Sequence, residues 1–311
     1  MHKILSFLQE NMSFAAETLF HGDLVAFPTE TVYGLGGNAY DDEAVTKIFQ
    51  YKGRPQFNPV SVCYANINDA AKDVELTKLA ETLAERFLPG PLTIVLKRRE
   101  NSRLSWLCSA GQETIGVRIP DSEIASALLS AVPFPLAAPS ANRSSELSPT
   151  TAKAVSDSLK SNENLIILDG GQCKVGIEST IVDLSTSTPK LIRVGAILAE
   201  EIESICGVRI EKGKSLAASV KHYVPNKPLV MNATSAESDD ALLAFGTPFA
   251  NNCEYMLNLS LTADLNEAAT NFFYMLHELD KTDAKRICVM PIPSQGIGAA
   301  INEKLKAGSE N

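Results

Sequence analysis

Two cations, Lys52 and Arg54, flank a single glycine near the start of the chain. An arginine offers a planar fork of donors and a lysine offers a compact charge, so the pair suits a polyphosphate. Pro55 favours an extended backbone before it, and an extended segment would project both cations to the same side. A Lys-Gly-Arg sequence more often belongs to a solvated basic loop than to a binding site. The polar residues elsewhere in the chain nevertheless favour a binding site for one anion.

Several apolar runs that are predicted to be strands are followed by polar residues or by a predicted glycine-rich turn. These are Thr31, Gly34, Gly36, Gly37, Ser140, Asn142 and Arg193. Glycines let backbone approach a ligand closely, and open α/β sheets bind ligands where their strands end. Ser140 and Asn142 also suit ordinary turns, and Ser148 before Pro149 suits a helix N-cap whose helix start could hold an anion. Together these residues predict an anion site, most simply for a nucleotide.

Other kinds of site are disfavoured. The sequence contains neither G-x-x-x-x-G-K-[ST] nor G-x-G-x-x-G, so the P-loop and the dinucleotide fingerprint do not apply. His2, His21, His222 and His277 fall outside the predicted cluster, which argues against a histidine base. We therefore expect chemistry by positioning and charge stabilisation, as in phosphoryl and nucleotidyl transfer.

The amino-acid composition indicates which cellular compartment and which classes of partner to expect. Six cysteines without C-x-x-C spacing favour reduced thiols in a cytoplasmic protein over a disulfide framework or a protein-bound metal. A formal net charge of -9 disfavours stable, sequence-independent nucleic-acid binding. No run is long enough to span a membrane, and the N-terminus lacks a signal-peptide core.

Strands that alternate with helices predict an α/β protein. Apolar periodicity predicts a helix over residues 4–20 and strands at 24–27, 60–64, 92–96, 114–120, 165–168, 181–184 and 191–195. A Lys/Gly/Ala/Ser-rich stretch then predicts a linker at 209–227, between a first domain at 1–208 and a small α/β domain at 228–311.

Five motifs in order resemble the YrdC-like threonylcarbamoyl-AMP synthase family. They are PTETVYGLG, KGRP with NP after it, APSAN with SPT after it, GIESTIVD and RVGAI. The His-Tyr-Val-Pro island at 222–225 and the small C-terminal unit are similar to the longer, two-domain form. The resemblance implies a twisted mixed sheet with flanking helices and a concave nucleotide site, plus a small Rossmann-like C-terminal domain.

The implied activity is L-threonylcarbamoyladenylate synthase, a nucleotidyltransferase. It forms threonylcarbamoyl-AMP and pyrophosphate from L-threonine, bicarbonate and ATP, with Mg²⁺ carried by the ATP phosphates. The product would pass to a tRNA threonylcarbamoyl transferase for tRNA threonylcarbamoyladenosine modification.

The motif matches also imply site residues. Lys52 and Arg54 would be catalytic, and the linker residue Tyr223 would cover the nucleotide as a lid. The implied ATP-binding residues are Arg54, Asn58, Thr114, Ser140, Asn142, Ser148, Arg193 and Tyr223. The implied L-threonine-binding residues are Thr31, Cys63, Arg118, Ser179 and Thr180.

The chain departs from the family pattern at Cys63, where a histidine is usual, and at Asn38, Val194 and residues 216–219. At Cys63 one polar partner of the substrate is lost. A related carbamoyl-adenylate-forming enzyme with a different substrate is therefore an alternative function. An RNA-binding YrdC-like module is a further alternative, disfavoured by the net charge, and an inactive relative would bind no ATP.

Overall fold

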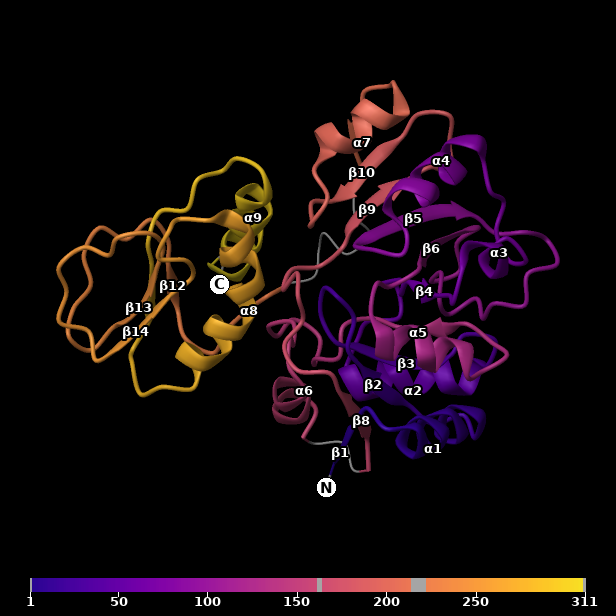
Figure 1. Cartoon of the computed structure of the whole chain (residues 1–311), viewed down its shortest axis with the longest axis horizontal. Helices are drawn as coiled ribbons and strands as arrows, with labels where there is room; N and C mark the ends of the chain where they lie inside the picture. Colours follow the sequence, from indigo (N-terminus) through magenta and orange to yellow (C-terminus); the bar gives the residue numbers. More distant parts are fainter. Residues whose placement is uncertain (1, 161–163, 214–221, 310–311) are drawn as a thin grey trace.

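The computed structural model describes residues 2–160, 164–213 and 222–309, which form two α/β units (Figure 1). The strands of the larger unit are β1 Lys3–Ser6, β2 Val25–Phe27, β3 Gly34–Asn38, β4 Val62–Cys63, β5 Leu92–Lys97, β6 Thr114–Arg118, β7 Leu136–Ala137, β8 Ile166–Asp169, β9 Thr180–Asp183, β10 Lys190–Arg193 and β11 Glu211–Lys212. In the described residues they form one 11-stranded sheet in the order β1-β8-β2-β3-β7-β4-β6-β5-β9-β10-β11. The sheet is mixed, because β2 runs parallel to β8 and antiparallel to β3.

Helices cover both faces of this sheet. They are α1 Gln9–Phe20, α2 Asp42–Lys52, α3 Ile67–Ala70, α4 Lys78–Phe87, α5 Glu123–Ser130, α6 Ala152–Ser158 and α7 Ala199–Cys206. Side chains of β2 alternate between two cores, as a buried strand requires. Val25 and Phe27 pack with α1 and α5, whereas Ala26 belongs to the core that contains α2 and α4.

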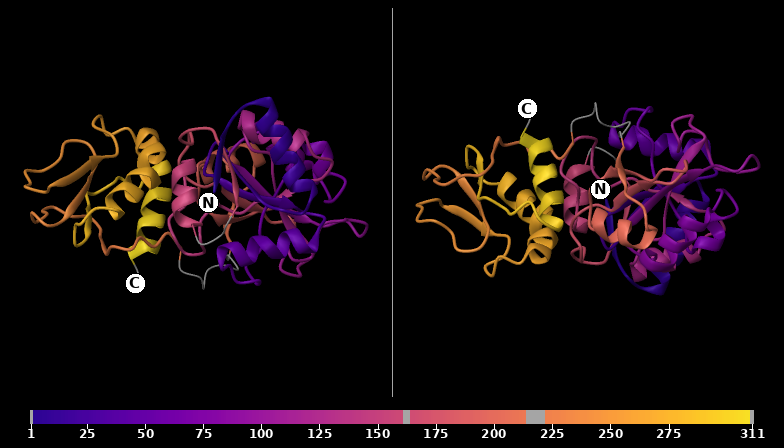
Figure 2. Two further views of the ribbon diagram at one scale, coloured as in Figure 1. Left: turned by 90° about the horizontal axis from the view of Figure 1, so that it is seen from below. Right: turned by 90° about the horizontal axis from the view of Figure 1, so that it is seen from above.

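The smaller unit has a parallel sheet in the order β12-β15-β13-β14. Its elements are β12 Leu229–Val230, β13 Ala241–Ala244, β14 Tyr255–Asn258, α8 Leu265–Asp280, β15 Ile287–Val289 and α9 Ile297–Ser309. Both helices lie between this sheet and the larger unit (Figures 1 and 2). Among the described residues, no helix is long and apolar enough to cross a bilayer.

The two units share one hydrophobic core. Phe272, Phe273 and Ile301 of the smaller unit cluster with Val32 and Ile177 of the larger one. The backbones also come very close, because a Cβ added at Gly176 would lie 2.4 Å from the carbonyl oxygen of Thr270 in α8. The units therefore pack as a continuous structure.

Three local predictions are wrong. The first helix begins at Gln9, because residues 3–6 form β1 and pair in parallel with β8. Gly34, Gly36 and Gly37 lie inside β3, without positive φ, so they are not a turn. Helix α6 is capped by the Thr151 side chain, which accepts from the backbone N–H of Ala154, so Ser148 is not its N-cap.

The predicted linker begins with a strand. β11 pairs in parallel with β10, so the first residues of the 209–227 segment belong to the edge of the large sheet. Residues 214–221, which include the altered stretch 216–219, lie outside the described residues. The domain limits predicted at 208/209 and 227/228 stay predictions.

Candidate active site

A cavity of about 710 Å³ lies against one face of the large sheet, a size typical of small-molecule sites. Alternate positions along three strands line it: Thr93 and Val95 of β5; Thr114, Gly116 and Arg118 of β6; and Ile181 and Asp183 of β9, with Ser179 directly before β9. Because side chains alternate across a strand, these positions share one face. The site was expected where strands end, as in an open parallel sheet, but the mixed sheet presents its face instead.

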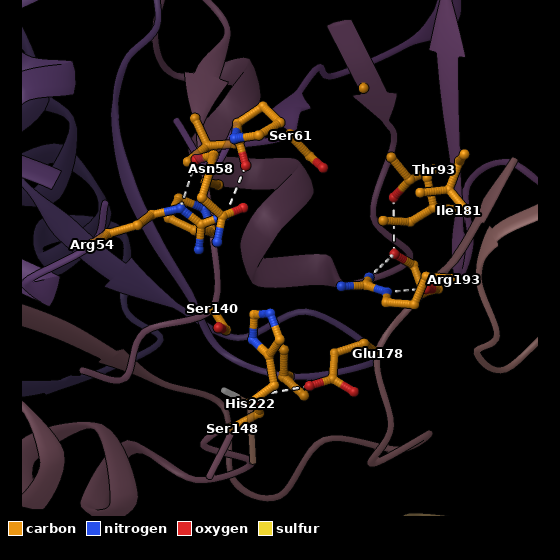
Figure 3. Close-up of a pocket in the computed structure, with 18 of the residues that line it drawn as sticks. Arg54, Asn58, Ser61, Thr93, Ser140, Ser148, Glu178, Ile181, Arg193 and His222 are labelled. Atoms are coloured by element: carbon orange, nitrogen blue, oxygen red, sulfur yellow. Dashed lines mark hydrogen bonds between the residues drawn. The ribbon is translucent and has the colours of Figure 1, made fainter. Parts of the chain in front are cut away.

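Three further segments close the cavity. Lining residues come from 54–61, from 138–148 and from the linker residues His222 and Tyr223. Glu303 and Ala307 of α9 complete the wall from the smaller unit. Figure 3 shows Arg54 and Asn58 across the open space from Thr93 and Arg193, with Ser140, Ser148, Glu178 and His222 below them.

Lys52 reaches the cavity as the last residue of α2. Its chain then turns at Gly53, which adopts the left-handed conformation at φ 59°. Its ammonium donates to the carbonyl oxygen of Ser140 at 2.5 Å and also to that of Asn142. Burial, with Arg54 nearby, lowers the pKa of Lys52 well below the ordinary lysine value. The predicted extended K-G-R geometry is therefore wrong, although Lys52 and Arg54 both line the cavity.

Two arginines on opposite sides of the cavity are held in fixed orientations. Arg54 donates from Nη2 to Asn58 Oδ1 at 2.7 Å and from Nε to the Asn58 carbonyl at 2.9 Å. Arg193 donates from Nη2 to Ser179 Oγ at 2.9 Å and from Nε to the Ser179 carbonyl at 3.0 Å. Ser179 Oγ also lies 2.8 Å from Thr93 Oγ1. Such preorganised donors suit a polyanion.

Arg118, the last residue of β6, lines the cavity and forms a buried ion pair. Its Nη2 donates to Glu30 Oε1 at 2.9 Å and to Thr31 Oγ1 at 2.6 Å. Burial disfavours the charge on Arg118, but the Glu30 carboxylate outweighs this and raises the pKa of Arg118. Thr31 itself does not line the cavity and instead orients Arg118.

The residues expected to bind L-threonine are thus divided. Arg118 and Ser179 line the cavity, whereas Thr31, Cys63 and Thr180 do not. Cys63 is 2% exposed in β4, and burial raises the pKa of its thiol to about 11. Thr180 Oγ1 donates to the carbonyl oxygen of Ile197 at 2.6 Å. All the residues expected to bind ATP line the cavity: Arg54, Asn58, Thr114, Ser140, Asn142, Ser148, Arg193 and Tyr223.

Several buried polar atoms of lining residues have no hydrogen-bond partner in the described part of the chain. They are Asn58 Nδ2, Arg118 Nε and Asn142 Oδ1; Glu178 Oε2 also lacks a hydrogen bond, but it lies 3.5 Å from the Lys304 ammonium. Buried polar atoms in proteins are nearly always paired. Their grouping around one cavity therefore marks a place where a polar ligand completes the hydrogen bonding.

Sequence reasoning missed five ionisable lining residues, Glu146, Glu178, Asp183, His222 and Glu303. The expectation that every histidine lies outside the site is wrong for His222, whose ring centroid is 5.7 Å from that of Tyr223. Its position beside Tyr223 in the 222–225 island was the available signal. No sequence signal pointed to Glu303, because α9 is distant in sequence from every motif.

The cavity is lined by cations and hydroxyls more than by metal ligands. Within residues 2–160, 164–213 and 222–309, no group of three or more His, Cys, Asp or Glu side chains is arranged to hold a metal ion. Lys52, Arg54 and Arg193 instead provide donors suited to phosphate oxygens.

Known proteins resemble the chain over nearly its whole length. Residues 17–195 match the Sua5–YciO–YrdC family, described as telomere recombination, and residues 197–309 match the threonylcarbamoyl-AMP synthase C-terminal domain. A threonylcarbamoyl-AMP synthase of Pyrococcus abyssi is 35% identical, over 95% of this chain and 93% of that protein. One of Bacillus subtilis is also 35% identical, over 94% of this chain and 90% of the relative.

A solved structure agrees. The crystal structure of P. abyssi Sua5 complexed with L-threonine superposes with a TM-score of 0.89 at 31% identity, covering 99% of this chain and 97% of that one. The fold of both units is thus shared with a known relative along nearly the whole chain. The chain belongs to the threonylcarbamoyl-AMP synthase family of enzymes, in its two-domain form.

Proposed function

We propose that this protein is an L-threonylcarbamoyladenylate synthase, which makes threonylcarbamoyl-AMP and pyrophosphate from L-threonine, bicarbonate and ATP. The observation that carries the proposal is one cavity lined by four cationic side chains. Lys52, Arg54 and Arg193 suit a polyphosphate, and Arg118 suits a carboxylate. An amino acid and a nucleotide can therefore bind side by side over the same sheet face.

The reaction follows from that placement. The amine of threonine captures bicarbonate to give a carbamate and water. A carbamate oxygen then attacks the α-phosphorus of ATP, the bond to the β-phosphate oxygen breaks, and pyrophosphate leaves. Lys52 and Arg54 stabilise the negative charge that develops on the phosphates. Mg²⁺ enters with ATP as part of the substrate and neutralises phosphate oxygens.

Arg118 and Ser179 hold the amino acid in this proposal. The guanidinium of Arg118 pairs with the threonine carboxylate, while Glu30 and Thr31 fix its orientation from behind. Ser179 Oγ, already bonded to Arg193, connects the amino-acid end of the site to the nucleotide end. Cys63 packs behind the cavity wall, so it gives no support to a different carbamoyl acceptor.

The linker supplies a cover for the reaction. His222 and Tyr223 line the cavity, and the Val224 N–H donates to the Ser145 carbonyl at 2.8 Å. Tyr223 adopts a positive φ of 60°, so the chain bends sharply here. Covering the site would protect a hydrolysable intermediate from water. The product then passes to a tRNA threonylcarbamoyl transferase in the cytoplasm, without stable RNA binding by this chain.

The test is pyrophosphate release from ATP with bicarbonate, Mg²⁺ and each standard amino acid in turn. Release with L-threonine alone is expected. Release with another amino acid would indicate a related carbamoyl-adenylate enzyme. ATP binding without any release would contradict the proposed reaction, and a tRNA shift by the protein alone would favour the RNA-binding alternative.

A further inference from the structure

We infer that Lys304, on helix α9 of the smaller unit, is a positioning residue for the nucleotide end of the cavity. It acts through Glu178 on the hydroxyl of Ser148. This inference rests on the proposed function, because it takes the Ser148 end of the cavity to bind ATP. It gives the smaller unit an indirect part in substrate binding.

Glu178 connects the two units through its two carboxylate oxygens. Its Oε1 accepts a hydrogen bond from Ser148 Oγ at 2.5 Å, as the dashed line in Figure 3 shows. Its Oε2 lies 3.5 Å from the ammonium of Lys304. Glu178 is 4% exposed and Lys304 is 1% exposed. The ion pair is therefore buried.

The ammonium of Lys304 has a defined place. It donates to the carbonyl oxygen of Val194 at 3.2 Å and lies 5.4 Å from the centroid of the Tyr223 ring. Burial lowers the pKa of Lys304, and the Glu178 carboxylate opposes that shift. A buried lysine with these contacts cannot move without leaving Glu178 unpaired, so the position of α9 fixes the position of the carboxylate.

A second side chain of the smaller unit holds the same serine. Nε2 of His277, on α8, lies 3.1 Å from the carbonyl oxygen of Ser148. A carbonyl only accepts, so Nε2 carries the proton. Burial lowers the pKa of His277, which favours the neutral ring. The backbone of Ser148 is thus held directly by α8, and its hydroxyl is held by α9 through Glu178.

This arrangement sets what Ser148 offers a ligand. Its single proton points to the Glu178 carboxylate, so only the oxygen lone pairs remain for a partner in the cavity. Ser148 would then accept a hydrogen bond from a donor group of the nucleotide, such as a ribose hydroxyl or an exocyclic amine. Without Lys304, Glu178 loses its anchor and the serine hydroxyl can rotate away.

The decisive experiment is a double-mutant cycle between Ser148→Ala and Lys304→Met. The dissociation constant for ATP is measured by calorimetry, and KM for ATP and for L-threonine by pyrophosphate release. K304M should weaken ATP binding about tenfold, because a buried pair has been broken, and should change the threonine KM little. Since Lys304 acts through Ser148, the S148A/K304M variant should bind ATP no more weakly than S148A alone.

Two further variants separate positioning from stability. Lys281→Met removes an exposed ion pair between the units, 3.3 Å to Asp157, and should leave ATP affinity unchanged. Glu178→Gln with Lys304→Met leaves no buried unpaired charge, so its Tm should recover while ATP binding stays weak. This double variant also carries the test if K304M fails to fold.

Three results would overturn the inference: wild-type ATP affinity in K304M, additive effects of S148A and K304M, or recovery of ATP affinity together with Tm in E178Q/K304M. Failure of the proposed function would look different. In that case the wild-type protein would bind ATP and release no pyrophosphate, while the calorimetric comparison of the variants would still decide the role of Lys304.

Discussion

At the scale of single residues, charge and hydrogen-bonding capacity decide which side chains serve the cavity. Arg54 has its guanidinium held by Asn58 and Pro59, with both Arg54 and Asn58 lining the site. Residue type and motif were enough to select Arg54, because an arginine fork suits phosphate oxygens. The hydrogen bonds that orient it depend on a turn that the sequence pattern did not predict.

Replacing Arg54 by alanine should abolish pyrophosphate release, a loss of at least about a hundredfold. The reason is that a preorganised charge facing the phosphates is removed. Arg143→Ala is the matched control, since Arg143 is exposed and does not line the cavity. Turnover near that of the wild type in R54A would exclude the catalytic role, whereas R143A should keep normal turnover.

Lys52 should make ATP binding sensitive to alkaline pH. Its pKa is lowered from the ordinary 10.5, so the ammonium loses its proton at a lower pH than an exposed lysine does. As pH rises through that pKa the cation is lost, and attraction for ATP falls. ATP affinity measured between about pH 7 and 10 should decline in the wild type.

Lys52→Arg is the informative comparison for this pH dependence. A guanidinium keeps its proton to higher pH, so the decline should move upward in K52R. The same midpoint in both proteins would mean that another group titrates.

At the scale of elements, close packing explains the glycines of β3 better than ligand approach does. A Cβ at Gly36 would lie 2.7 Å from Cε1 of the buried Phe27 ring. The absence of a side chain at Gly36 therefore leaves room for the Phe27 ring of the neighbouring strand β2. The sequence pattern alone predicts a turn for a glycine-rich run after a strand. The steric need for glycine becomes clear only when β3 is seen paired with β2, which carries Phe27.

Gly36→Ala should destabilise the protein by about 1–3 kcal/mol, the usual cost of overpacking a core. Gly34→Ala is the control in the same strand, because its Cβ would make an ordinary contact at 3.5 Å with Phe27. Urea unfolding of both variants measures the difference. Equal stability of G34A and G36A would contradict the steric explanation.

At the scale of the whole molecule, the smaller unit belongs to the active site. It provides Glu303 and Ala307 as lining residues and shares a core with the larger unit. The close approach of the smaller unit to the larger one depends on Gly176, where an added Cβ would clash with the backbone of Thr270. Site geometry should therefore depend on how closely the two units pack.

Gly176→Ala should push the units apart and reduce pyrophosphate release, while each unit keeps its own fold. Gly171→Ala is a close control. Both glycines have positive φ, 72° and 73°, but a Cβ at Gly171 meets nothing within 4 Å. Both substitutions carry a backbone cost of about 1–2 kcal/mol, and only G176A adds the clash. Small-angle scattering should show a larger radius of gyration for G176A alone. A larger radius in both variants, or in neither, would contradict this.

The sequence by itself determined the family, the α/β class and the lining residues that were expected to bind ATP. Those features are encoded locally: apolar runs predict strands, and contiguous motifs place Arg54, Asn142 and Arg193 near a ligand. The positions of most strands in the larger unit follow from the same local patterns.

The tertiary structure decided what depends on distant contacts. Strand pairing put the site on a sheet face and placed Thr31 behind Arg118. Packing of the two units brought Lys304 to Glu178, which accepts a hydrogen bond from Ser148. Glu178 and Lys304 are separated by more than a hundred residues of chain. No local pattern links them, because the burial that makes their ion pair significant arises only when the two units pack.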